Sequence, residues 1–381
     1  MKHIIIFSTA YDPFLGGAEV AVKEITDRIG DIEFHMVTAK MDRKLLKKEN
    51  IGNITVHRVG IGVPMIDKLF LAMFGHRKGI ALNSEIHFDL CWSIMASYSG
   101  FAARLFKKKT GIPFLLTLQE GDPFDYIQKK VRFVRKKFEG IFSSADGLQA
   151  ISTYLLNWGK NMGFQGEISK VIPNGVDIGK FKIQNSKFQI EAREEIRNKC
   201  SIPENGKILV TVSRLVKKNG VGDLIEAMKR LGDTVHLLVI GTGELESDLR
   251  AFSKELGLED RVHFSGRIEH QDLPKYLWAS NIFCRPSLSE GLGNVFLEAM
   301  AAGLPVIGTM VGGIPDFLED EKTGFVCNPE DVESITRAVE KVLGLSEEDL
   351  DVILKRTQSL VQEKFNWDTI AVDMRNMMIV L

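Results

Sequence analysis

The sequence predicts an α/β protein made of two doubly wound domains, each with a parallel sheet at its centre. Short apolar runs alternate with amphipathic stretches through most of the chain, which is typical of alternating strands and helices. The length of 381 residues is sufficient for two domains of ordinary size. A Pro-Asn-Gly turn at 173–175 separates two such series. In folds of this class, ligands bind beyond the carboxyl ends of the parallel strands.

The apolar runs that we expect to be buried strands fall into two series. In the first domain they are 4–7, 34–37, 89–92, 114–118 and 147–151, with 55–59 as a further candidate. In the second domain they are 208–212, 235–240, 262–264, 282–284 and 306–307. The intervening segments are expected to be the helices that cover the two sheets.

Composition indicates a globular protein of a reducing compartment. Hydrophobic residues make up 44% of the chain and charged residues 26%, and the four cysteines form no C-x-x-C pair. Three of the cysteines lie in apolar runs, so we expect buried thiols and neither disulfides nor metal ligands. The apolar run after Lys2 is too short for a signal peptide, and glycine and proline interrupt the uncharged run 299–315. We therefore expect a cytoplasmic protein.

The net charge of −1 conceals an asymmetry between the two halves of the chain. Residues 1–175 hold 24 Lys and Arg against 17 Asp and Glu, whereas the remainder holds 25 against 33. Two segments, 64–79 and 129–138, interleave basic and large apolar side chains. Such segments either lie on an anionic membrane surface or are helices packed on the sheet with a solvated basic face. Peripheral contact with the inner membrane face is thus one expectation, and no nucleic-acid partner is expected.

The most informative stretch runs from Asn281 to Pro305. An apolar run leads into a loop that contains Glu290 and two glycines, and a helix then begins near Asn294, with Glu298 about one turn inside if Asn294 is the N-cap. The free N–H groups of a helix start attract an anion such as phosphate. A carboxylate one turn further could hold the hydroxyls of a ribose, although acidic residues near helix starts are also common as caps. The pattern suggests a site for a nucleotide-sugar diphosphate.

The motif Glu290-x7-Glu298 resembles that of the retaining glycosyltransferases of family 4, which have the GT-B fold. Its Gly-Leu-Gly-Asn centre and its Glu-Ala-Met-Ala-Ala-Gly-Leu-Pro tail carry the resemblance, which extends to most of the chain. It implies two Rossmann-like domains that face a cleft. Residues 1–175 would bind the acceptor, joined by a C-terminal helix at 365–381 that crosses back, and residues 176–364 would bind the nucleotide sugar.

The resemblance also implies the reaction and the residues that carry it. A sugar would move from a UDP- or GDP-linked donor to a hydroxyl of a sugar or lipid-linked acceptor, in polysaccharide or glycolipid assembly of the cell envelope. Arg214, Lys218 and the amides of the loop 291–294 would neutralise the leaving diphosphate, Glu290 would contact the sugar, and Glu298 the ribose. The implied catalytic residues are Glu290, Arg214 and Lys218. The implied donor-binding residues are Gly16, Gly17, Arg214, Lys218, Arg267, Glu290, Leu292, Gly293, Asn294 and Glu298.

The chain departs from the family pattern at two positions. The usual lysine five residues after Arg214 is replaced by Asn219, and we expect the preceding Lys218 to take over its role because a lysine stem is long and flexible. A histidine that reaches the donor sugar in many relatives is replaced by Gln119, which cannot take a proton. Gln119, Glu120 and Asp122 are expected either to contact the acceptor or sugar or to cap the loop.

No cofactor is expected, since the nucleotide sugar is a co-substrate. No D-x-D motif or His/Cys cluster predicts a metal site. Two other functions remain open at this point. One is a different GT-B enzyme, such as a sugar-nucleotide epimerase or a phosphorolytic enzyme; turnover without an acceptor would favour the epimerase. The other is a non-catalytic nucleotide-sugar binding protein, which tight nucleotide binding without turnover would favour.

Overall fold

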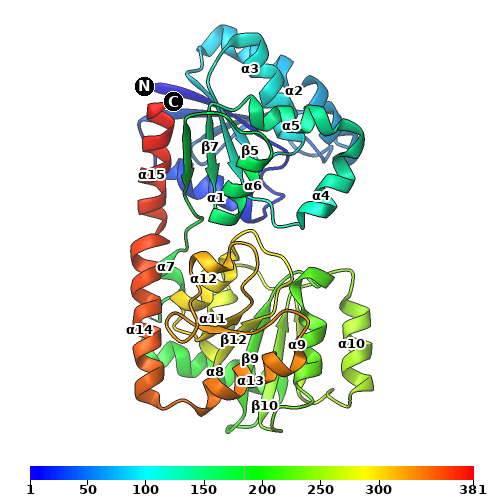
Figure 1. Cartoon of the computed structure of the whole chain (residues 1–381), viewed down its shortest axis with the longest axis vertical. Helices are drawn as coiled ribbons and strands as arrows, with labels where there is room; N and C mark the ends of the chain where they lie inside the picture. Colours follow the sequence, from blue (N-terminus) through cyan, green and yellow to red (C-terminus); the bar gives the residue numbers. More distant parts are fainter. Residues whose placement is uncertain (184) are drawn as a thin grey trace. The chain divides into compact units, whose positions relative to one another are not determined.

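The computed structural model describes residues 1–183 and 185–381 and divides into two compact units (Figure 1). Unit 1 comprises Met1–Gly175 together with Trp367–Leu381, and unit 2 comprises Val176–Asn366. Each unit contains one sheet whose strands are mainly parallel and separated by helices. The structure therefore confirms the predicted α/β class with two doubly wound domains.

The sheet of unit 1 has the strand order β3-β4-β2-β1-β5-β6-β7-β8. Neighbouring strands are parallel except β3 and β4, which pair antiparallel. The isoleucines of β1 are fully buried, because a parallel strand with helices on both faces has no solvent side. The strands are β1 (Lys2–Ser8), β2 (Ile32–Ala39), β3 (Lys48–Ile51), β4 (Ile54–Val59), β5 (Leu90–Ile94), β6 (Phe114–Leu118), β7 (Gly147–Ala150) and β8 (Ile168–Val171).

The helices of unit 1 follow its strands in chain order, as the blue to green colours of Figure 1 show. They are α1 (Gly17–Asp27), α2 (Pro64–Ile86), α3 (Tyr98–Thr110), α4 (Phe124–Val131), the 3-10 turn η1 (Arg132–Val134), α5 (Arg135–Ser143) and α6 (Thr153–Asn161). The basic segment 129–138 is thus divided between two short helices and a turn, whereas 64–79 lies within the single long helix α2.

The C-terminal helix α15 (Trp367–Val380) packs on unit 1, beside α1 (Figure 1). Trp367, Met374 and Met378 are buried in the same core as the strands β1 and β2. An ion pair between Arg375 and Asp31, and another of 2.7 Å between Lys170 Nζ and Asp373 Oδ1, flank this apolar contact. The predicted return of the last helix to the first domain is therefore confirmed.

The sheet of unit 2 has the order β11-β10-β9-β12-β13-β14 and is parallel throughout. Its strands are β9 (Lys207–Val212), β10 (Val235–Ile240), β11 (Val262–Gly266), β12 (Ile282–Arg285), β13 (Val306–Gly308) and β14 (Phe325–Val326). The other elements are α7 (Ile178–Phe181), α8 (Ser186–Cys200), η2 (Lys217–Asn219), α9 (Val221–Ala227), α10 (Glu246–Glu255), α11 (Leu273–Ala279), α12 (Asn294–Ala301), η3 (Ile314–Asp316), α13 (Val332–Gly344) and α14 (Glu347–Lys364). Strands β9 and β12 are central neighbours, so the loops after them meet at one edge of the sheet.

Candidate active site

The loop between β12 and α12 enters the helix through Gly293, which has a φ of 96°. Glycine adopts this left-handed conformation without strain because it has no Cβ. Gly293 is the N-cap of α12, and Asn294 is its first helical residue. The expectation that Asn294 caps the helix was wrong for this reason. Glu298 is the fifth residue of α12, about one turn from the free N–H groups at its start.

The loop after β13 holds Glu290 in place from the other side. The N–H of Gly313 donates to the carbonyl oxygen of Glu290 at 3.2 Å. A Cβ on Gly312, whose φ is 58°, would lie 1.8 Å from that oxygen, so the approach requires glycine. The Glu290 loop is thus fixed by packing against a second loop.

A buried arginine at the end of β12 forms the centre of a polar network. The Nη2 of Arg285 donates to Asn219 Oδ1 at 3.0 Å and forms an ion pair with Glu290. The Arg285 side chain is 11% exposed and that of Glu290 14%. Glu290 also accepts the N–H of Gly291 through its other carboxylate oxygen, at 3.1 Å. Arg285 therefore orients the carboxylate that the sequence assigns to the sugar.

Asn219 joins this network to the loop after β9. Its Nδ2 donates to the carbonyl oxygen of Arg214 at 2.6 Å, and the residue is only 2% exposed. The N–H of Leu288 donates to the carbonyl oxygen of Lys218 at 2.7 Å. The structure thus brings together the backbones that carry Arg214, Lys218 and Glu290. Arg214 itself is exposed and Lys218 half-buried.

Glu298 contacts a histidine that the sequence analysis did not identify. The distance between His270 Nε2 and Glu298 Oε1 is 2.8 Å, and that between His270 Nδ1 and Lys180 Nζ is also 2.8 Å. An ammonium can only donate, so Nδ1 accepts and Nε2 donates to the carboxylate. The side chain of Glu298 is 15% exposed and that of His270 53%. A ligand that binds Glu298 therefore meets a carboxylate that is already oriented.

Two other residues of unit 2 that were predicted to bind the donor, Leu292 and Arg267, lie outside the network of Arg285, Glu290 and Asn219. Leu292 is 1% exposed, so its side chain belongs to the core and only its backbone is available to a ligand. Arg267 follows β11 and is 78% exposed, with its Nε 3.5 Å from Glu269. The structure gives Arg267 no contact with the Glu290 network or with Glu298.

The glycines predicted to approach the donor phosphate lie at the start of α1 in unit 1. Gly16 is the N-cap and Gly17 the first helical residue, and both are exposed. The N–H of Gly16 donates to Glu19 Oε2 at 2.8 Å. Burial raises the pKa of Glu19 above its ordinary value, against the opposing effect of its backbone hydrogen bonds.

The residues predicted for the acceptor side lie after β6 in unit 1. Glu120 is 7% exposed, and its Oε1 accepts the N–H of Ala96 at 2.7 Å. Within residues 1–183 and 185–381, its Oε2 has no hydrogen-bond partner. Burial raises the pKa of Glu120 to about 7, with a smaller contribution from Asp122. Gln119 accepts a hydrogen bond from Asn174 Nδ2 through its Oε1, at 3.2 Å. Because its pKa is about 7, the carboxyl group of Glu120 can exchange a proton near neutral pH.

The sequence analysis missed two residues of the site in unit 2, Arg285 and His270. Arg285 could have been identified, because it directly follows the apolar run Ile282–Cys284 and a charged residue at the end of a strand lies at the ligand-binding edge of the sheet. His270 carries no comparable signal, because it meets Glu298 only through the tertiary fold.

No group of His, Cys, Asp or Glu in the described part of the chain could hold a metal ion, and no helix there is long and apolar enough to span a membrane.

Comparison with known proteins defines the class. A family model described as "Glycosyl transferases group 1" matches residues 192–358, and one described as "Glycosyltransferase Family 4" matches residues 15–180. Together these consecutive matches cover most of both units. The chain belongs to the family-4 glycosyltransferases and has the GT-B fold.

Particular relatives agree with this family. Over 321 residues the chain is 27% identical to TuaC of Bacillus subtilis (strain 168), a glycosyltransferase assigned to teichuronic acid biosynthesis, covering 80% of this chain and 77% of TuaC. Among solved structures, sucrose-phosphate synthase from Thermosynechococcus elongatus aligns with a TM-score of 0.86 and 22% identity, over 100% of this chain and 99% of the other. Anabaena HepE in complex with UDP and glucose aligns with a TM-score of 0.79 and 19% identity, over the full length of both chains.

Proposed function

We propose that this protein transfers a sugar from a UDP- or GDP-sugar to an acceptor hydroxyl and that the product keeps the anomeric configuration of the donor. The observation that carries the proposal is the single ligand edge of unit 2, where hydrogen bonds join the Arg214 loop to the Arg285–Glu290 pair and the Glu290 loop leads into the start of α12. Bound UDP in the similar fold of HepE supports a nucleoside diphosphate as the ligand.

In the proposed reaction the bond between the anomeric carbon and the diphosphate oxygen breaks, and its electron pair leaves with the diphosphate. The acceptor oxygen bonds to the anomeric carbon, and its proton passes to the carboxylate of Glu120. Arg214, Lys218 and the N–H groups at the start of α12 stabilise the charge that develops on the diphosphate, which is where preorganised donors accelerate a reaction most. Glu298 holds the ribose hydroxyls, and Glu290 the sugar.

We assign to Arg285 part of the role that the family lysine has at position 219. Asn219 has no charge, yet its side chain lies 3.0 Å from the guanidinium of Arg285. The positive charge is therefore present in the same network but comes from β12. In the proposed reaction, Arg214, Lys218 and Arg285 stabilise the negative charge of the leaving diphosphate without a metal ion or cofactor.

On the acceptor side we assign a role to Glu120. Its buried carboxyl has one oxygen with no partner in the described chain and a pKa of about 7, so it can accept a hydrogen bond or a proton from an acceptor hydroxyl. Gln119, fixed by Asn174, donates a hydrogen bond from its amide nitrogen but takes no proton. Asp122 is assigned to acceptor contact as well.

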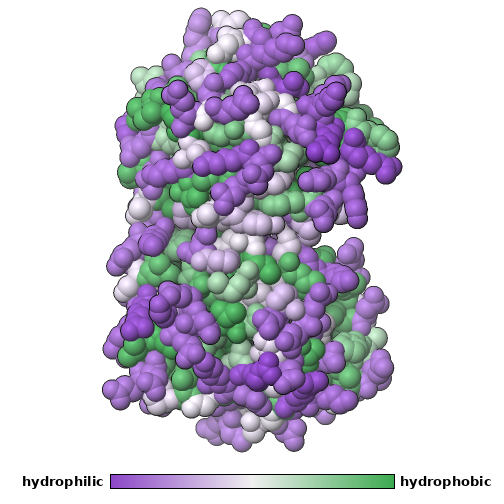
Figure 2. All heavy atoms as spheres, viewed as in Figure 1, coloured by the Kyte–Doolittle hydropathy of each residue, from purple (hydrophilic) through white to green (hydrophobic). Residues whose placement is uncertain are grey.

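We further propose that the acceptor is lipid-linked and is met at the inner membrane face. On α2 the side chains of Met65, Ile66, Leu69 and Met73 are each about half exposed or more. Phe133, in the basic segment 129–138, is 84% exposed. On the face shown in Figure 2, hydrophobic residues form separate patches among hydrophilic ones.

A panel of nucleotides and nucleotide sugars tests the proposed function. Thermal unfolding should shift upward with UDP or GDP, because a ligand at 100 times its dissociation constant adds about 2.7 kcal/mol to the free energy of unfolding. The stabilising sugar nucleotide is then incubated with candidate acceptors, and the anomeric proton coupling of the product is read by NMR. Turnover without acceptor would instead indicate an epimerase, and an inverted product would contradict retention.

A further inference from the structure

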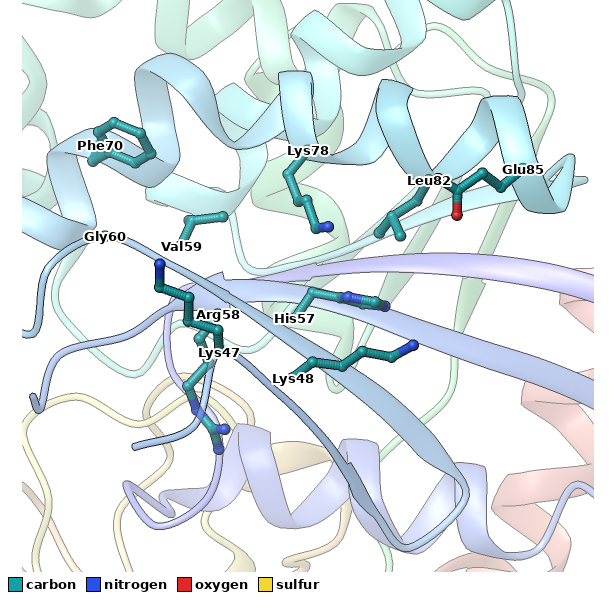
Figure 3. Close-up of a pocket in the computed structure, with 10 residues that line it drawn as sticks. All are labelled: Lys47, Lys48, His57, Arg58, Val59, Gly60, Phe70, Lys78, Leu82 and Glu85. Carbon is teal, nitrogen blue, oxygen red and sulfur yellow. The ribbon is translucent and has the colours of Figure 1, made fainter. Parts of the chain in front are cut away.

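A cavity of about 440 Å³ lies in unit 1 between the hairpin β3–β4 and the helix α2 (Figure 3). None of its lining residues belongs to the loops that follow β1 or β6. Four of its ten lining residues are basic, Lys47, Lys48, Arg58 and Lys78, and Glu85 is its one acidic residue. A volume of this size is typical of small-ligand sites.

The lysines of this cavity are available to a ligand, whereas its arginine is not. Arg58 forms an ion pair with Glu49 and donates to the carbonyl oxygen of Asp12 at 2.7 Å. In Figure 3 its guanidinium points away from Lys78. Among the described residues, the ammonium groups of Lys47, Lys48 and Lys78 have no hydrogen-bond or ion-pair partner.

In Figure 3 the ends of the Lys48 and Lys78 side chains lie on either side of His57. Lys48 on β3 is the antiparallel partner of His57 on β4, and Lys78 extends from α2 toward the same strand (Figure 3). His57 is 3% exposed, with its Nε2 3.3 Å from His35 Nδ1. Burial, with smaller contributions from the charges of Lys78, His35 and Lys48, lowers the pKa of His57 to about 4. His57 is therefore neutral at pH 7, in a positive field.

Phe70 and Leu82 of α2 complete the wall of the cavity. Phe70 is 42% exposed and belongs to the apolar stripe of α2 whose other members are Ile66, Leu69 and Met73. The spacing of these residues, three and four apart, places them along one face of the helix. The basic cavity thus opens beside an exposed apolar surface on the same helix.

We propose that this cavity binds a phosphate group, with Lys48 and Lys78 as its charged ligands, Lys47 at its rim and the His57 ring at its floor. Charge-assisted hydrogen bonds from the two lysines to phosphate oxygens would attract the ligand. The cavity has a net positive charge because its lysines outnumber its single carboxylate. The phosphate belongs either to a lipid headgroup, whose chain then lies along the stripe of α2, or to a soluble phosphate compound. The site is separate from the donor site of unit 2.

The test uses the full chain and inorganic pyrophosphate as the probe, with UDP or GDP present to occupy the donor site. The double variant K48Q/K78Q should bind pyrophosphate at least about tenfold more weakly than the wild type. K48R/K78R, which keeps both charges, should bind like the wild type. K160Q/K229Q removes two exposed lysines elsewhere and is the matched control. Binding in the wild type should also shift the ring signal of His57, which the H57Q variant assigns among the eight histidines.

Vesicles of phosphatidylcholine, with and without phosphatidic acid, distinguish the two sources of phosphate. Weaker binding of both K48Q/K78Q and the stripe variant L69Q/M73Q to the acidic vesicles supports a lipid phosphate. Pyrophosphate binding that depends on Lys48 and Lys78, without such an effect on vesicles, supports a soluble compound. Equal pyrophosphate binding by K48Q/K78Q, K160Q/K229Q and the wild type, with an unshifted His57 signal, would overturn the proposal. Nucleotide binding by unit 2 should be unchanged in every variant, so failure here is distinct from failure of the proposed function.

Discussion

Replacing Arg285 by Met removes the positive charge while leaving an unbranched apolar side chain in the same buried position. The variant leaves the carboxylate of Glu290, with 14% of its side chain exposed, and the Oδ1 of Asn219 without their shared donor. Breaking a buried ion pair on one side costs about 3–5 kcal/mol, and the residual exposure of both side chains favours the lower end. We therefore expect a loss of about 3 kcal/mol in the free energy of unfolding. Sugar transfer should fall about 100-fold or more, equivalent to about 2.7 kcal/mol.

Two further variants distinguish the loss of charge from the loss of stability. R285M/E290Q removes both charges, so it should regain much of the stability measured by urea denaturation while transfer stays low. R285M/N219K places a lysine at the family position, so it should regain part of the transfer rate. N219K alone should destabilise the fold, because it sets an ammonium against the guanidinium of Arg285 at a site that is 2% exposed. Wild-type transfer by R285M, or no recovery by a folded R285M/N219K, would refute the assignment of the cation to Arg285.

The remaining predictions concern single positions. Glu298→Ala should weaken nucleotide-sugar binding in calorimetry by roughly 1.5–3 kcal/mol with little effect on unfolding, and unchanged affinity would remove Glu298 from the site. Lys218→Ala should lower turnover by roughly 10–100-fold while Lys217→Ala does little; equal rates for both would show that neither acts on the diphosphate. Glu120→Gln should lower transfer and abolish a rise in rate near pH 7. Because the folded-state pKa of Glu120 is raised to about 7, wild-type stability should decline by about 3 kcal/mol relative to this variant from pH 4.5 to 7. Parallel stability curves would contradict the burial argument.

The strands of both sheets were predictable because most are short, fully apolar runs. The run 114–118 coincides with β6, and 235–240 with β10. Strand β3 was not predicted, since its sequence Lys-Glu-Asn-Ile is polar and half exposed at the edge of the sheet, where pairing with β4 alone defines it. Strand β8 is likewise short and only partly buried.

The polar contacts of the candidate site depend on distances that local sequence does not encode. The separation between Asn219 and Arg285 is 66 residues along the chain, and that between His270 and Glu298 is 28. The sequence indicated that position 219 had lost its lysine, but only the fold places Arg285 against it. The cap at Gly293 was missed because asparagine is also a good N-cap, and φ alone distinguishes the two.

A crystal structure of the full chain with UDP or GDP would show directly where the nucleotide binds. We expect a diphosphate at the start of α12, with oxygens within hydrogen-bond distance of the N–H groups there and of Arg214. We also expect a ribose whose hydroxyls bind Glu298 in place of, or together with, His270. A nucleotide bound away from these groups would refute the proposed donor site, as would a diphosphate that contacts neither the Arg285–Glu290 network nor the start of α12.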